Sequence, residues 1–149
     1  TSPAEIEADC PQQHPDACGR WRRIRMKYAD GCEIILDGEN REAEVPFIEG
    51  PDGKLFRGFR SDIAGYREKV AELPDPEPQV TDFGRAVRER KTFALNEANA
   101  HRSCTIVNLA KIAVRLGRPL RFDPAAERFL GDEEANRLID EPMRAPWRM

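Results

Sequence analysis

His101 is the side chain in this sequence best placed for chemistry on a bound ligand. It is one of only two histidines, and it stands in the run NEANAHRS at the start of a predicted apolar helix. Backbone N–H groups and the positive end of a helix dipole favour a neutral imidazole and contact with a polar ligand. The alternative is that His101 and Arg102 cap and pair between packed elements.

Two neighbours of His101 are also candidate substrate ligands. Asn96 and Glu97 precede it at the entry to the same helix. Their side chains also suit hydrogen bonds to free backbone groups at a helix start, which is the simpler interpretation. We find no Ser, His and Asp arrangement with a nucleophile-elbow context, and the adjacent Glu133 and Glu134 fit a capped helix better than a glycosidase pair. No residue is therefore assigned as catalytic.

Basic residues gather in two places. Between Arg20 and Lys27 they alternate with apolar residues, which places the later charges on one solvated face of a strand. Arg57 and Arg60 stand near the end of a second predicted hairpin, where either could meet a substrate hydroxyl or a partner's carboxylate. A solvated strand charge is the simpler interpretation there as well.

The four cysteines contain no CxxC pair, which argues against a structural metal site. Three of them could nominally join His14 in a tetrahedral zinc site: Cys10, Cys18 and Cys32. Pro11 and Pro15 prevent a helix from aligning the first part of that set. We expect unpaired thiols and no metal, with a Cys10 to Cys18 disulfide and a zinc site left as alternatives.

The elements that must position these residues begin with strands. Residues 1 to 20 contain three prolines and no apolar periodicity, so we expect an entry loop without a core of its own. Alternating residues over 21 to 38, turning at Asp30-Gly31, predict a β-hairpin. A second hairpin is predicted over 45 to 59. Together the hairpins predict one antiparallel sheet of at least four strands.

Helices follow the strands. Apolar spacing predicts a helix within 61 to 73, weakened by Gly65, and a second helix that Thr81 would cap. The clearest helix follows a connector at 91 to 97, is expected to be buried on more than one side, and stops at Gly117. Short extended pieces at 119 to 124 and 128 to 131 precede a last helix, which Asp132 would cap. Hairpins followed by helices indicate an α+β fold.

Composition excludes some classes of partner. The net charge is -3 and the charges are interspersed, so no basic field attracts nucleic acid. No apolar run approaches the roughly 20 residues that span a bilayer, which excludes a membrane partner. The first residues lack the pattern of a signal peptide. We expect a cytoplasmic protein, with an exported parent left open because the chain does not begin with Met.

The second half of the chain resembles the C-terminal end of bacterial Gfo/Idh/MocA oxidoreductases, a family named for glucose-fructose oxidoreductase and inositol dehydrogenase. The resemblance covers residues 81 to 149 well and the hairpins from 21 to 61 loosely. Four short segments carry it most specifically: HRS at 101 to 103, RLGRPLRFDP at 115 to 124, GDEEAN at 131 to 136, and RAPW at 144 to 147.

The resemblance implies an open antiparallel β-sheet with helices packed on one side, over residues 21 to 149. In the family this domain shapes the substrate side of the cleft and often forms the subunit interface, while an N-terminal Rossmann domain binds NAD or NADP. The resemblance therefore implies a homo-oligomer acting on a sugar, cyclitol or related polyol. Its Rossmann partner is absent from this chain.

The motifs of the redox half are missing here. No G-x-G-x-x-G follows a predicted strand, and neither the family's Glu-Lys-Pro motif nor its Asp-x-x-x-His pair occurs. We expect the isolated chain neither to bind the cofactor well nor to turn over substrate. The alternative function is a non-catalytic, stand-alone interaction module that kept the sheet for self-association.

Overall fold

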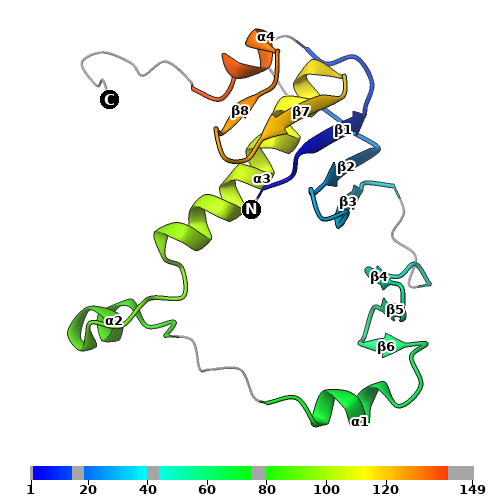
Figure 1. Ribbon diagram of the computed structural model, residues 1–149, viewed down its shortest axis with the longest axis vertical. Coiled ribbons are helices and arrows are strands. Elements are labelled where there is room, and N and C mark those ends of the chain that lie inside the picture. Colours follow the sequence, from blue (N-terminus) through cyan, green and yellow to red (C-terminus); the bar gives the residue numbers. More distant parts are fainter. Residues whose placement is uncertain (1, 15–18, 40–43, 75–79, 141–149) are drawn as a thin grey trace. The chain divides into compact units, whose positions relative to one another are not determined.

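The computed structural model describes residues 2 to 14, 19 to 39, 44 to 74 and 80 to 140. The chain divides into two compact units. Unit 1 combines residues 1 to 39 with 95 to 149, and unit 2 comprises residues 40 to 94. Figure 1 labels the elements of both units.

Unit 1 is built on a five-stranded antiparallel sheet with the order β3-β2-β1-β7-β8. Its strands are β1 (Glu5–Asp9), β2 (Arg23–Lys27), β3 (Glu33–Asp37), β7 (Leu120–Asp123) and β8 (Arg128–Phe129). The predicted hairpin over 21 to 38 is confirmed as β2 and β3. The extended pieces predicted after residue 118 are confirmed as β7 and β8.

Strand alternation separates a core face of this sheet from an open face. On the core face Ile6, Ile24 and Met26 are almost fully buried, whereas their neighbours in sequence are exposed. The helix α3 (Glu97–Leu116) packs against β1 and β2 on this side (Figure 1). The remaining core residues come from the helix, the later strands and α4: Leu109, Ala110, Ile112, Ala113, Val114, Leu120, Phe122, Phe129 and Ala135.

The entry loop predicted for residues 1 to 20 is wrong at residues 5 to 9, which form β1. This strand pairs with β2 on one side and with β7 on the other, so it lies at the centre of the sheet. Ile6 pairs with Met26 and with Leu120, and its side chain is 1% exposed. A strand with so few apolar residues gains its stability from neighbours distant in the sequence, and local periodicity cannot reveal them.

Helix α3 begins and ends at residues that stop the helix for identifiable reasons. The Asn96 side chain accepts a hydrogen bond from the Asn99 N–H at 3.0 Å, which caps the N-terminus. Gly117 adopts φ 61 at the other end, as its predicted role as a stop requires. Burial is confined to the half from Leu109 onward, and residues 97 to 104 are exposed, so the predicted burial is found only in the second half of the helix.

A short helix, α4 (Glu133–Asn136), closes unit 1. Its N-cap is Asp132, as predicted, because the carboxylate accepts a hydrogen bond from the Ala135 N–H. Arg118 donates to Asp132 through both terminal nitrogens, and one of them also donates to Glu134 at 2.9 Å. These contacts fasten α4 to the connection between α3 and β7.

Unit 2 contains its own three-stranded antiparallel sheet. The strands are β4 (Ile48–Gly50), β5 (Gly53–Phe56) and β6 (Arg60–Ser61). The second hairpin is therefore confirmed, but the single sheet predicted from both hairpins is wrong. No described residue of β4, β5 or β6 pairs with a strand of unit 1, since each hairpin finds its further partners within its own unit.

Both helices of unit 2 differ from the prediction, the first in its length and the second in its N-cap. Helix α1 (Tyr66–Ala71) starts only after Gly65, whose φ of 65 is left-handed. Helix α2 (Phe83–Glu89) is capped by Asp82, which accepts from the Arg85 N–H at 2.8 Å, so the prediction of Thr81 as the cap is wrong by one residue. The fold is α+β with open antiparallel sheets, as the sequence predicted.

Candidate functional site

A groove of about 450 Å³ runs along α3 in unit 1. One wall comes from the helix and the other from β7, the β7–β8 turn and the residues after α4. On the helix the groove-lining positions recur every three or four residues, so they share one face. The principal side chains are His101, Thr105, Asn108, Leu109, Ile112 and Arg115 on the helix, and Phe122, Glu127, Leu138 and Ile139 opposite.

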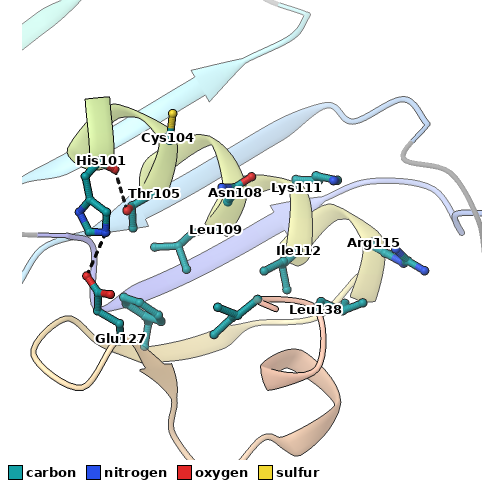
Figure 2. Close-up of a pocket in the computed structure, with 12 residues that line it drawn as sticks. His101, Cys104, Thr105, Asn108, Leu109, Lys111, Ile112, Arg115, Glu127 and Leu138 are labelled. Atoms are coloured by element: carbon teal, nitrogen blue, oxygen red, sulfur yellow. Dashed lines mark hydrogen bonds and ion pairs between the residues drawn. The ribbon is translucent and has the colours of Figure 1, made fainter. Parts of the chain in front are cut away.

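His101 and Glu127 meet across one end of this groove. The His101 Nε2 lies 3.2 Å from the Glu127 Oε1, and both side chains are more than half exposed. Figure 2 shows the imidazole turned from α3 toward the carboxylate. The pair offers a nitrogen and a carboxylate that can hydrogen-bond a polar ligand.

The backbone on both sides holds this pair in place. Glu127 has φ 52, an uncommon conformation for a residue with a side chain. The preceding turn is fixed by Asp123, whose Oδ1 accepts hydrogen bonds from the N–H groups of Ala125 and Ala126 at 2.9 and 3.2 Å. On the helix, the Thr105 hydroxyl donates to the His101 carbonyl at 2.8 Å.

The floor of the groove is apolar. Leu109, Ile112 and Phe122 are each at most 5% exposed, and Leu138 packs partly buried against them. Figure 2 shows Leu109 and Ile112 pointing into the hollow, and Lys111 and Arg115 also line the groove. The site therefore combines an apolar floor with polar and charged side chains along the helix and with the His101 and Glu127 pair at one end.

The structure brings only one of the four predicted ligands into the groove. His101 lines it, whereas Arg102 is exposed and does not. Asn96 caps α3, which is the simpler of its two interpretations, and Glu97 is exposed in the first helical turn, where an acidic group complements the dipole. Substrate contact by any of the four stays a prediction.

The sequence alone did not indicate that Glu127 and the apolar residues opposite the helix belong to the site. The helical positions Thr105, Asn108 and Ile112 follow from His101 by adding three or four, so periodicity alone would have found them. Glu127 is different, because its approach to His101 depends on how the β7–β8 turn folds back toward α3. No local pattern signals that contact.

The basic stretch of β2 lies on the open face of the sheet, as predicted. Arg23, Arg25 and Lys27 are exposed. In the strand register each faces an acidic residue on β1, and Arg23 and Lys27 face one on β3 as well, where Arg25 faces Ile35. These acidic partners are Asp9, Glu7 and Glu5 on β1, with Asp37 and Glu33 on β3. A shallow hollow of about 220 Å³ lies among these charges. The alternating columns neutralise one another rather than form a basic field.

Nearby arginines are also paired. Arg22 donates to Asp9, with its Nε 3.0 Å from Oδ2, and this hydrogen bond lowers the pKa of Asp9. In unit 2, Arg60 lies in β6 and forms an ion pair with Glu44 at 3.6 Å. The interpretation of Arg60 as a surface strand charge fits this geometry.

The described cysteines are separate from one another. Cys10, Cys32 and Cys104 carry free thiols, and Cys18 lies outside the described residues. A Cys10 to Cys18 disulfide is therefore not supported. Within the described ranges, no group of three His, Cys, Asp or Glu residues is arranged to hold a metal ion. In the same part of the chain, no helix has the length and apolar composition to cross a membrane.

Comparison with known protein families gives one match. Residues 1 to 149 match the model of the Gfo/Idh/MocA oxidoreductase family, C-terminal alpha/beta domain. The match includes residues 1 to 20, which carried no resemblance by inspection. Searches of curated proteins and of solved structures gave no match.

Proposed function

This chain belongs to the Gfo/Idh/MocA oxidoreductase family through its C-terminal alpha/beta domain, and on that premise we propose that it forms the substrate-side wall of an NAD(P)-dependent enzyme. The substrate class proposed is a sugar, cyclitol or related polyol. The observation that carries the proposal is the pair of His101 and Glu127 at the polar end of the α3 groove.

The residues of this chain do not fit a dinucleotide. Such a cofactor is held where a parallel strand feeds a Gly-rich turn and a helix N-terminus. The sheets described here are antiparallel, and no G-x-G-x-x-G occurs. We therefore assign NAD or NADP to an N-terminal Rossmann domain of the same polypeptide, and to this chain the tasks of binding and orienting the substrate.

His101 would orient a substrate hydroxyl through one imidazole nitrogen while Glu127 holds the other. A hydrogen bond of this kind fixes the plane of the ring and selects which nitrogen accepts. Arg102, Asn96 and Glu97 stand on the same helix entry and are proposed only as supporting contacts from that end. The proposed compartment is the cytoplasm.

The open face of the sheet is the proposed oligomerisation surface. Its columns of opposite charge on β1 and β2 are complementary to a second copy turned by a half rotation, which would place each acidic column over a basic one. The same observation supports the second candidate, a stand-alone interaction module. Light scattering of the 149-residue chain tests self-association, which both candidate functions predict. A cofactor assay on the protein encoded by its complete reading frame is needed to distinguish them.

The test is made on that complete protein. We expect dehydrogenase activity with NAD or NADP on a polyol, and a loss of about 10- to 100-fold in kcat/KM for His101→Ala, the effect of removing one hydrogen bond to substrate. Ser103→Ala, an exposed position of α3 outside the groove, is the matched control. Equal activity of wild type and His101→Ala would show that His101 is not part of the site. Tight NAD binding by this chain alone would contradict the assignment of the cofactor to a separate Rossmann domain.

A further inference from the structure

We propose that the α3 groove takes a neutral polyol that carries an apolar substituent, such as an alkyl or aryl glycoside. The proposal rests on the proposed function for its polyol part and adds the apolar part. It also predicts that phosphorylated and other anionic sugars bind less well than neutral ones.

The apolar part follows from the floor of the groove. Leu109, Ile112 and Phe122 belong to one apolar cluster and line the groove together, and the Phe122 ring packs edge-to-face on Phe129 with the ring centroids 5.3 Å apart. A sugar hydroxyl placed on this surface would lose hydrogen bonds to water without gaining others. An alkyl or aryl group placed there loses no hydrogen bonds and buries more apolar area.

The polar part of the proposal follows from the end of the groove where His101 meets Glu127. His101 and Glu127 lie at that end, where the Glu127 carboxylate is the acidic group. Lys111 and Arg115 also line the groove, but more than two helical turns from His101. An anionic group at the polar end would face the Glu127 carboxylate, so electrostatics disfavour a phosphate there.

The size of the groove agrees with a two-part ligand. Its volume of about 450 Å³ lies within the range of roughly 300 to 1,000 Å³ found for small-molecule sites. Helical spacing separates the polar and apolar parts, since His101 lies two turns before Leu109 and three before Ile112. A ligand that reaches both has its hydroxyl groups at one end and its substituent along the helix.

The experiment is calorimetric titration of the 149-residue chain with methyl, butyl and hexyl β-D-glucoside and with glucose 6-phosphate. We expect affinity to rise along the alkyl series, by up to about fourfold for each methylene that becomes fully buried. We expect glucose 6-phosphate to bind more weakly than methyl glucoside. His101→Ala should weaken all three glucosides by a similar factor, because it touches only the shared sugar.

Leu138→Asn places a polar group in the floor of the groove and should reduce the increase in affinity with alkyl length. Ile139→Asn, at a more exposed lining position, serves the same purpose if Leu138→Asn does not fold. Val107→Asn is the matched control, since Val107 is 65% exposed on the same helix and does not line the groove.

Three results would overturn the inference: no binding of any glucoside, affinity that does not change with alkyl length, or equal effects of Leu138→Asn and Val107→Asn. These titrations need no cofactor and no turnover. The inference can therefore fail while the complete enzyme still oxidises free polyols through His101. Conversely, affinity can rise with alkyl length while the complete enzyme shows no redox activity. That result would reject the proposed function alone.

Discussion

The Asn136 carboxamide bonds to both backbone groups of Phe129. Its Oδ1 accepts from the Phe129 N–H at 2.8 Å, and its Nδ2 donates to the Phe129 carbonyl at 3.0 Å. The side chain thus takes the place of a further strand along β8, and it joins α4 to the edge of the sheet. Phe129 is 2% exposed and packs against Phe122, so this contact also supports the floor of the groove.

Replacing Asn136 with Ala should destabilise unit 1 by about 1 to 3 kcal/mol, because it leaves two backbone groups of a buried residue without partners. Urea unfolding followed by circular dichroism measures the change. Asn108→Ala, at an exposed position of α3, should change the midpoint little. A midpoint for Asn136→Ala that matches this control would show that the two hydrogen bonds contribute no net stability.

The central position of β1 makes Ile6 a test of the sheet topology. Ile6→Ala should cost about 2 to 5 kcal/mol, the usual range for emptying a buried aliphatic position. Glu7→Ala lies next to it on the open face and should cost far less. If both variants unfold at the same urea concentration as wild type, β1 does not form the centre of the sheet.

Gly117 should be sensitive to substitution for reasons of backbone conformation alone. A Cβ at this position meets nothing within 4 Å, but the φ of 61 is unfavourable for a residue with a side chain. Gly117→Ala should therefore lose about 1 kcal/mol, and Gly117→Asn less, because Asn tolerates the left-handed region better. Thermal unfolding of the two variants side by side checks the order, and a more stable Ala variant would refute it.

The Asp132 carboxylate should make the free energy of unfolding depend on pH in the acidic range. Hydrogen bonds from Arg118 and from the Ala135 N–H lower the pKa of Asp132 to about 2 from 3.8. Because the folded pKa is the lower one, this contribution is complete above about pH 4 and is lost as pH falls toward 2. Asp132→Asn keeps an acceptor oxygen for the cap but not the charge.

The measurement for Asp132 is the unfolding free energy of wild type and Asp132→Asn between pH 6 and pH 3. We expect the difference between them to shrink as the pH falls, since protonation removes from wild type what the variant already lacks. A difference that stays constant over this range would mean that the Arg118 contact does not depend on the ionised carboxylate.

Local patterns in the sequence predicted much of this fold. The β2–β3 hairpin, the stop of α3 at Gly117 and the Asp132 cap all depend on residues close together in the chain. The place of β1 and the separation of the two sheets depend on pairing between distant segments. Such pairing is decided by packing of the whole unit, which no short window of sequence contains.

The candidate site divides in the same way. His101 was predicted from its type and its place at a helix start, whereas Glu127 reaches it only because the turn after β7 adopts a left-handed conformation at that residue. The apolar floor is likewise assembled from α3, β7 and the segment after α4. Sequence periodicity indicates which residues form the helical wall of such a groove, but it does not indicate which residues lie opposite the helix.

We propose that the α3 groove holds the substrate of a complete oxidoreductase. The most direct measurement is a crystal structure of the full-length protein with NAD or NADP and a bound polyol. We expect the polyol in the groove, with a hydroxyl oxygen within hydrogen-bond distance of His101. Substrate bound elsewhere, with His101 out of its reach, would contradict it.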